Sequence, residues 1–233
     1  MTETADRSTL AAITRRRLLA GTAAITTIAA AGLAPHVAFA QRRGSGPAEI
    51  PVEDLMKTVD GRADVALGPP EAKVTVVEYA SMTCGHCSKF HTDVFPKIKE
   101  KYIDTGKVRF VMREFPLDNL AAAASMLARC APGDKVYPMV DMLFKTQHDW
   151  AFVQGNPVPK LLEIAKQAGF TQETFDKCLT NQKLLDQINA QRARASEQFG
   201  VSATPSFFIN GKKLQGAPTL EAFEAMFEPL LKS

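Results

Sequence analysis

Short apolar runs alternate with helical stripes along most of this chain, and the alternation predicts a mixed α/β fold. Residues 73–80 are rich in β-branched residues and follow a Pro-Pro pair, which is typical of a buried strand. Residues 108–115 form a second such run, which Pro116 ends. Between the two runs, apolar residues recur every four positions, as in a helix packed against a sheet. These positions are Phe90, Val94, Ile98 and Tyr102. The pattern predicts a strand–helix–strand unit, and Pro96 is expected to kink its helix.

The C-terminal part of the chain predicts a hairpin followed by a helix. Residues 201–212 have the pattern of a turn, a strand and an Asn-Gly hairpin turn, and residues 213–215 pair back. Thr219 is expected to cap a terminal helix. The apolar face of this helix consists of Leu220, Phe223, Phe227 and Leu230.

The segment 117–199 is predicted to be an insertion made of helices. Residues 120–130 are alanine-rich and strongly helix-forming, and residues 136–144 have apolar residues at a spacing of three and four. Three more helices are expected further along; they cover residues 161–165, 171–179 and 184–199. The fold class is therefore a central mixed sheet flanked by helices, with an inserted helical domain.

The first 40 residues are typical of an export signal and not of the fold. Arg15 and Arg16 precede an apolar stretch that glycines and threonines interrupt, and Ala38-Phe39-Ala40 fits a cleavage site near Ala40. The paired arginines resemble the twin-arginine (Tat) type of signal. An uncleaved membrane anchor is the alternative, but the stretch is poorly apolar for a spanning helix. We expect a periplasmic protein, in a compartment where disulfides persist. Residues 41–72 are expected to hold a linker and a first strand.

Composition and charge exclude two broad classes. The 233 residues are 45% hydrophobic and 23% charged, which allows a sizeable core and excludes disorder over most of the length. The 28 basic and 25 acidic residues give a net charge of +3. This balance is unlike a protein that binds nucleic acid through its overall charge, and we expect no nucleic-acid partner.

The most informative motif is Cys84-Gly85-His86-Cys87. A c-type haem site requires histidine directly after the second cysteine, where this chain has Ser88. A zinc site formed with His91 lacks a fourth ligand at short spacing, so no metal is expected. A redox-active dithiol and a structural disulfide remain. His91 itself is expected at the surface or half-buried.

The position of the motif favours the redox-active dithiol. The first turn of a helix has unpaired N–H groups and the positive end of the helix dipole, and both stabilise a thiolate on Cys84. His86 adds a nearby donor or cation. Cys87, one turn along, is expected to be more buried and to act as the resolving thiol. A structural disulfide needs neither the helix N-terminus nor the histidine.

The other two cysteines, Cys130 and Cys178, lie in two of the predicted inserted helices. In an oxidising compartment we expect a structural disulfide between them. Two buried free thiols are the alternative, since cysteine packs as a small hydrophobic residue.

Two segments together resemble the thioredoxin fold: the strand containing Glu78 followed by Cys84-Gly85-His86-Cys87, and residues 203–211, Ala-Thr-Pro-Ser-Phe-Phe-Ile-Asn-Gly. With the insertion and the export signal, the chain resembles the DsbA family of periplasmic thiol–disulfide oxidoreductases over residues 50–231. Residues 73–116 and 200–233 would form the thioredoxin-like domain. The best-known members have proline where Gly85 stands, and Cys-Gly-His-Cys is also similar to the motif of eukaryotic disulfide isomerases.

The resemblance implies a cis bond at Pro205, with Thr204 and Pro205 beside the sulfurs where substrate backbone binds. It also implies that Glu78, behind the dithiol, helps to move protons. The expected function is the introduction of disulfide bonds into reduced, unfolded exported proteins, with no cofactor beyond the Cys84–Cys87 disulfide and with a quinone-linked membrane protein as reoxidase. A disulfide isomerase or reductase and a chaperone-like binder are the alternatives. We expect a monomer, because the stretch from Gln41 to Lys73 is too short for the dimerisation domain usual in isomerases.

Overall fold

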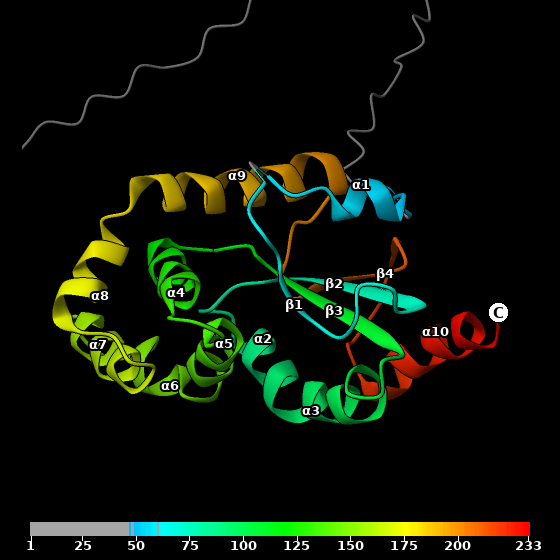
Figure 1. The fold of residues 1–233 in the computed structure, drawn as a ribbon, viewed down its shortest axis with the longest axis horizontal. Coiled ribbons are helices and arrows are strands. Elements are labelled where there is room, and N and C mark those ends of the chain that lie inside the picture. Colours follow the sequence, from blue (N-terminus) through cyan, green and yellow to red (C-terminus); the bar gives the residue numbers. More distant parts are fainter. Residues whose placement is uncertain (1–46, 48, 60) are drawn as a thin grey trace, which may run out of the picture. The chain divides into compact units, whose positions relative to one another are not determined.

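The computed structural model describes Pro47, residues 49–59 and residues 61–233, so the predicted export signal lies outside the described residues (Figure 1). A five-stranded sheet in the order β1-β3-β2-β4-β5 forms the centre of the described part. Its two central strands, β2 and β3, are parallel, and every other neighbouring pair is antiparallel. The strands are β1 (Val65–Leu67), β2 (Val74–Ala80), β3 (Val108–Glu114), β4 (Ser206–Ile209) and β5 (Lys212–Lys213).

The two central strands coincide within one residue with the predicted apolar runs. All but one residue of each is buried, because helices cover both faces of the sheet and leave no polar side to the strand. β2 and β3 pair from Val74 with Val108 to Ala80 with Glu114, so their carboxyl ends meet at one edge of the sheet. The segment that follows β2 at this edge contains the Cys-Gly-His-Cys motif.

The predicted Asn-Gly hairpin joins β4 to β5. Asn210 and Gly211 have φ angles of 43° and 86°, the left-handed conformations that a two-residue hairpin turn of this type requires. A side chain at Gly211 would place Cβ 1.9 Å from the carbonyl oxygen of Ile50, so only glycine fits there. The Asn210 side chain in turn accepts a hydrogen bond from the Thr75 N–H at 2.7 Å, which ties the turn to the start of β2.

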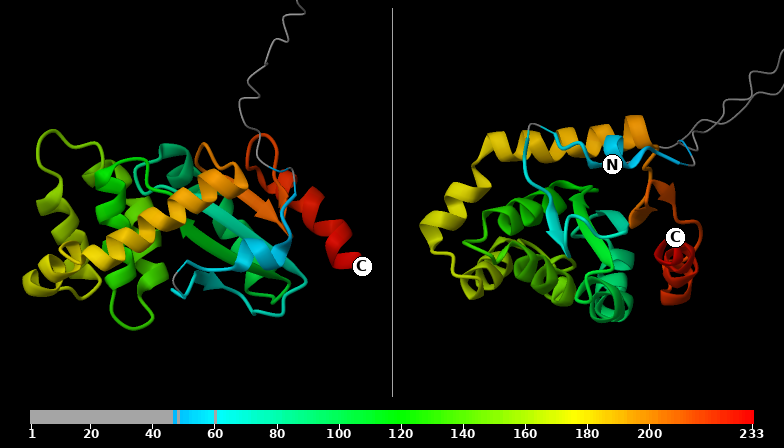
Figure 2. Two further views of the ribbon diagram at one scale, coloured as in Figure 1. Left: turned by 90° about the horizontal axis from the view of Figure 1, so that it is seen from above. Right: turned by 45° about the vertical axis from the view of Figure 1, so that its right-hand side comes forward.

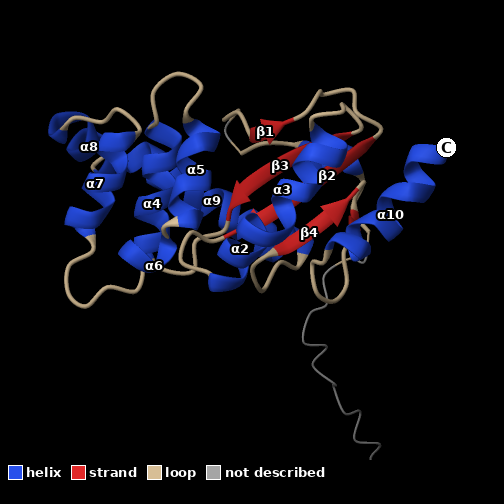
Figure 3. Cartoon of the chain, turned by 90° about the horizontal axis from the view of Figure 1, so that it is seen from below, coloured by secondary structure: helices blue, strands red, loops and turns tan. Residues whose placement is uncertain are grey.

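Helices cover the two faces of the sheet in separate groups. One face packs against α1 (Val52–Met56) and the end of α9 (Gln182–Phe199), which together bury Tyr79 and Phe208. The other face packs against the long helix that follows the motif and against α10 (Leu220–Lys232), around Phe90 and Phe223. Figure 3 shows this second group lying over the strands. Thr219 caps α10 by accepting a hydrogen bond from the Ala222 N–H at 3.2 Å.

The helix after the motif passes Pro96 by widening its turns. It consists of α2 (Gly85–Lys89), η1 (Phe90–Val94), α3 (Phe95–Ile98) and η2 (Lys99–Ile103), where η marks π-helical turns. In η1 the Phe95 N–H reaches back five residues to the carbonyl of Phe90. Proline has no N–H to donate, and a local change from α to π turns is a known way to absorb such a defect.

The insertion between β3 and β4 is helical throughout, as predicted. Its first five helices are α4 (Asn119–Cys130), α5 (Val136–Lys145), α6 (Gln147–Trp150), α7 (Val158–Gln167) and α8 (Gln172–Leu179). Asp118 and Thr171 cap α4 and α8 by accepting hydrogen bonds from backbone N–H groups. α9 then returns across the sheet and ends at Gly200 in a left-handed conformation (Figure 2). No helix in the described part of the chain combines the length and the apolar character needed to cross a bilayer.

Candidate active site

Cys84 lies at the junction between β2 and α2. The chain leaves β2 at Ala80 and turns so that the Cys84 N–H donates to the Ser81 carbonyl at 3.1 Å. Cys84 has extended backbone angles and is the N-cap residue, so the helix begins at Gly85. Only 9% of Cys84 is exposed, whereas Gly85 and His86 beside it are exposed. Cys84 is therefore buried but lies directly beside exposed residues, whereas Cys87 is 0% exposed.

The surroundings of Cys84 favour its thiolate. They lower the pKa of Cys84 from 9.0 to about 5, and the largest cause is a hydrogen bond from the Cys87 thiol. Burial opposes the shift, while the backbone N–H groups of His86 and Cys87 add to it. The helix N-terminus thus contributes, but the partner thiol contributes more. The His86 side chain is exposed, and it is the backbone of His86 that stabilises the sulfur.

Cys87 has the opposite character. It is completely buried, and its pKa lies well above the ordinary value of 9.0. Burial is the largest cause, followed by the hydrogen bond that its thiol donates to Cys84 and by the charge of Glu78. The pKa values of the two cysteines are thus shifted in opposite directions. The surroundings favour a thiolate at Cys84, the outer sulfur, and a thiol at Cys87, the inner sulfur.

The loop before β4 lies against the outer sulfur. The peptide bond between Thr204 and Pro205 is cis, the conformation that the family resemblance implies. The Cys84 Sγ lies 3.2 Å from the carbonyl oxygen of Thr204. Both loop residues are only half-buried, so they border the surface next to Cys84.

A buried acid and a buried imidazole lie behind the dithiol. Glu78 in β2 is 0% exposed, and its Oε2 is 2.8 Å from the Nε2 of His91. The expectation that His91 lies at the surface or half-buried is wrong, because this residue is only 1% exposed. His91 belongs to η1, and the wider π turn directs it towards the sheet. The sequence pointed to His91 only as a zinc ligand, because its observed partner, Glu78, lies on another element and leaves no local pattern.

Two residues, Gln147 and Ser88, join the motif to the insertion through hydrogen bonds that no sequence pattern indicated. The buried Gln147 of α6 donates from Nε2 to the carbonyl of Met82 at 2.7 Å and to that of Cys84 at 3.1 Å. Ser88 donates from Oγ to the Phe144 carbonyl at 2.8 Å. Gln147 thus bonds the carbonyl of Met82 and adds a second hydrogen bond to the carbonyl of Cys84, which also accepts from the Ser88 N–H at 3.1 Å. A single glutamine in a helical insertion has no local pattern that predicts this role.

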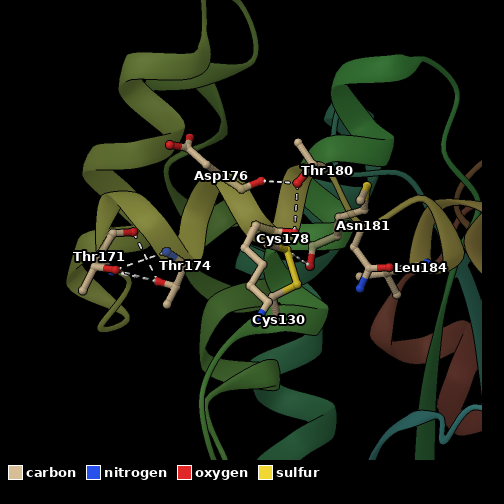
Figure 4. The surroundings of a disulfide bond; sticks show 10 residues. Cys130, Thr171, Thr174, Asp176, Cys178, Thr180, Asn181 and Leu184 are labelled. Atoms are coloured by element: carbon tan, nitrogen blue, oxygen red, sulfur yellow. Dashed lines mark hydrogen bonds between the residues drawn. A yellow bond between two sulfur atoms is a disulfide. The ribbon is translucent and has the colours of Figure 1, made fainter.

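The second pair of cysteines lies within the insertion. Cys130, the last residue of α4, is joined to Cys178 of α8 by a disulfide with an S–S distance of 2.11 Å (Figure 4). Thr171 and Thr174 cap the same α8 helix a few residues earlier. In contrast, Cys84 and Cys87 are free thiols in this structure. Within the described residues, no group of three or more His, Cys, Asp or Glu side chains is placed to hold a metal ion.

Comparison with known proteins gives consistent relatives. The family model described as thioredoxin matches residues 61–228. A Rickettsia bellii protein named "Putative protein-disulfide oxidoreductase" is 37% identical over 149 residues, which cover 64% of this chain and 57% of that protein. The chain thus spans less than two thirds of the length of the rickettsial relatives it matches. Disulfide bond formation protein D of Bacillus subtilis is 30% identical over 172 residues, covering 71% of this chain and 76% of that protein.

A solved structure extends the likeness to three dimensions. The crystal structure of alpha-DsbA1 from Wolbachia pipientis superposes with a TM-score of 0.70 at 34% identity, covering 77% of this chain and 95% of that one. The expected fold class, a mixed sheet flanked by helices with an inserted helical domain, is thereby confirmed. The chain belongs to the thioredoxin family and, within it, to the DsbA-like thiol–disulfide oxidoreductases.

Proposed function

We propose that this protein introduces disulfide bonds into exported proteins by thiol–disulfide exchange through Cys84 and Cys87. The observation that carries the proposal is the opposite ionisation of the two sulfurs. The pKa of Cys84 is lowered to about 5, whereas that of Cys87 is raised well above 9.0. Exchange needs a stable thiolate that leaves easily and a second thiol that stays protonated until it is used.

The proposed reaction begins with the oxidised Cys84–Cys87 bond. A substrate thiolate attacks Cys84 Sγ, a mixed disulfide forms, and Cys87 leaves and takes up a proton. A second substrate thiolate then attacks the substrate sulfur of the mixed disulfide and releases Cys84 as its stable thiolate. The substrate gains one disulfide, and the protein gains the two electrons as a reduced dithiol.

The same ionisation sets the direction of transfer. A thiolate that accepts hydrogen bonds, the largest contribution coming from the Cys87 thiol, stabilises the reduced protein more than the oxidised one. A dithiol whose reduced form is stabilised gives up its disulfide readily, so the protein acts as an oxidant. A separate protein must then reoxidise it, and the family resemblance points to a quinone-linked membrane protein.

The remaining roles in the site are part of the same proposal. Thr204 and Pro205 would hold substrate backbone, which their half-buried position next to Cys84 supports. Glu78 would carry the proton of Cys87, which its charge acting on Cys87 supports. The clients would be reduced, unfolded proteins in the periplasm, reached through a Tat-type signal cleaved near Ala40, and the protein would act as a monomer.

The test is oxidation of a reduced model protein by the wild type and by Cys84→Ser. We expect Cys84→Ser to lose the activity by about 10³-fold or more, because no other residue replaces the attacked sulfur. Reduced Cys87→Ser, mixed with a disulfide-bonded peptide, should accumulate a mixed disulfide at Cys84. Full activity of Cys84→Ser would contradict the proposal and favour a binder of unfolded chains.

Equilibration with glutathione buffers separates an oxidant from a reductase or isomerase. The fraction of reduced dithiol, read by mass spectrometry after alkylation, should remain high in buffers that are themselves oxidising. A dithiol that stays oxidised in mildly reducing buffer would favour a reductase. Unfolding curves of each variant verify that the fold is intact.

A further inference from the structure

Glu78 and His91 form an isolated polar pair inside an apolar core. The two side chains are 0% and 1% exposed, and one hydrogen bond of 2.8 Å joins them. The imidazole stacks on the ring of Phe144 with centroids 4.3 Å apart and lies 5.1 Å from the ring of Phe95. The other oxygen of Glu78 and the Nδ1 of His91 find no hydrogen-bond partner among the described residues.

Few titratable groups face this pair. Cys87 approaches it from α2. The half-buried Tyr137, whose hydroxyl is buried, approaches it from α5; burial raises the pKa of this tyrosine most, and the charge of Glu78 raises it further. Asp141, also on α5, acts on Tyr137 more weakly. Among the described residues no lysine or arginine forms an ion pair with Glu78.

This setting favours one shared proton. A bare carboxylate beside a neutral imidazole would leave an unpaired negative charge in the core, which costs several kcal/mol. One proton on either partner removes that net charge, whether as carboxylic acid with imidazole or as carboxylate with imidazolium. The carboxyl and the imidazole thus offer a donor and an acceptor for a proton at one buried position.

The pair lies next to the sulfur whose proton must move. His91 follows Cys87 by four residues on the same helical segment, so the two side chains lie on the same buried side. Glu78 reaches both from β2: it bonds His91, and its charge raises the pKa of Cys87. Cys87 is completely buried, so its thiol does not exchange its proton with solvent directly.

We propose that His91 is a positioning residue for thiol exchange, which holds with Glu78 the proton that Cys87 gives up and takes back. The inference deepens the proposed function and rests on it. When a substrate thiolate breaks the Cys84–Cys87 bond, the pair protonates the departing Cys87 thiolate. The pair then regains this proton from solvent. In the reverse step, the pair first releases its proton to solvent and then accepts the proton of Cys87, as Cys87 attacks the mixed disulfide and expels the other thiolate.

The experiment follows the reduced protein as it reacts with the aromatic disulfide DTNB in a stopped-flow instrument. Attack by Cys84 releases a first coloured thiolate, and attack by Cys87 on the mixed disulfide releases a second. The first phase reports on Cys84, and the second reports on deprotonation and attack by Cys87. Both are recorded between about pH 6 and about pH 8, where histidine changes charge.

Two substitutions separate a proton role from a packing role. His91→Gln keeps a hydrogen-bond donor for Glu78 but binds no proton, and His91→Phe keeps the ring stacked on Phe144. In both variants we expect the second phase to slow by about tenfold or more at neutral pH, up to about 10²-fold. The logarithm of the rate constant of the second phase should then rise by about one unit per pH unit, because only solvent deprotonates Cys87. The wild-type second phase should instead reach a plateau in this range.

The control is His148→Gln, which alters an exposed histidine on α6. It should keep both wild-type phases, and the first phase should be unchanged in every histidine variant. Glu78→Gln combined with His91→Gln should slow the second phase no more than either alone, since the two act as one unit.

A plateau retained in His91→Gln and His91→Phe, or additive losses in the double variant, would overturn the inference while leaving the proposed function intact. A wild-type protein that releases the first coloured thiolate but never the second would overturn both. Thermal unfolding of each variant shows whether a slower phase reflects damage to the fold.

Discussion

The chain contains two pairs of cysteines that differ in almost every physical respect. Cys84 and Cys87 are two residues apart at a helix N-terminus, and they are free thiols in the structure. Cys130 and Cys178 are 48 positions apart, in two helices of the insertion, and form a disulfide. The first pair is bordered by hydrogen-bond donors and by a buried acid, whereas the second sits between helix surfaces.

The comparison shows that the surroundings of a cysteine decide its use. Donors around Cys84 stabilise one ionised sulfur, and burial keeps its neighbour protonated, so the bond between them is easily broken. At the second pair, a bond that closes a long loop mainly restricts the unfolded chain. One pair is thus suited to electron transfer and the other to stability.

The largest expected effect concerns the second pair. The double substitution Cys130→Ala/Cys178→Ala should lower the free energy of unfolding by about 4 kcal/mol, because the unfolded chain is no longer closed into a loop across a sequence separation of 48. The melting temperature should fall by about 8–16 °C for a domain of this size. Oxidation of a model protein below the new melting temperature should stay within about twofold of wild type. Loss of oxidase activity in a folded variant would contradict the division of roles.

The next effect concerns the support of the reactive pair. Gln147→Leu removes the donor to the carbonyls of Met82 and Cys84, and should cost about 1–3 kcal/mol of stability. Hydrogen exchange should speed up at residues 82–87 and not around Cys178. The control Gln167→Leu alters an exposed glutamine at the end of α7 and should change neither. Equal exchange in both variants would show that Gln147 does not support the motif.

The pH dependence of Cys84 is the third way to sharpen the comparison. The pKa of Cys84, about 5, lies below the ordinary value of 9.0. The reduced protein is therefore stabilised relative to the oxidised one as pH rises from about 5 towards about 9. This stabilisation is lost as pH falls back through the same range. The alkylation rate of Cys84 by iodoacetamide should be flat above about pH 6. It should fall about tenfold per pH unit below about pH 5. A midpoint near that of free cysteine would contradict the assignment of the outer sulfur.

The smallest effect concerns the residue between the reactive sulfurs. Gly85 is the first residue of α2, and a Cβ at this position would meet no atom within 4 Å. Cys84, the residue before it, already has the extended backbone angles that a following proline requires (φ −83°, ψ 115°). Gly85→Pro should therefore fit and stabilise the protein by about 0.4–1 kcal/mol through the unfolded chain. Gly155→Pro, at a position with φ of 87°, should destabilise it instead. A loss of stability in Gly85→Pro would show that the turn before α2 is held in another conformation.

Much of the fold follows from local patterns that the sequence displays directly. Short, mainly apolar runs near prolines predict β2 and β3, and such runs are typical of strands that are covered on two faces. The Asn-Gly pair predicts the hairpin at residues 210–211 because few residues adopt its left-handed angles. The Cys-Gly-His-Cys motif likewise indicates its own chemistry, since a helix N-terminus stabilises an anion.

The parts of the site that sequence analysis missed depend on contacts between distant elements. The spacing of four from Phe90 to Tyr102 assumes regular α turns, and on such a helix His91 lies beside the buried stripe. The π turns around Pro96 rotate that side inwards, which buries His91 and leaves Val94 only half-buried. The strongest donor to Cys84 was also missed, because spacing alone does not rank a thiol against backbone amides.

The strand order has a consequence for how the chain assembles. Val76 of β2 pairs with Ile209 of β4, so one side of β2 stays without its neighbour until the whole helical insertion has been synthesised. Non-local pairing of this kind slows folding and leaves an open strand edge on the nascent chain. The insertion, which is itself rich in local helical contacts, can be complete before β4 closes that edge.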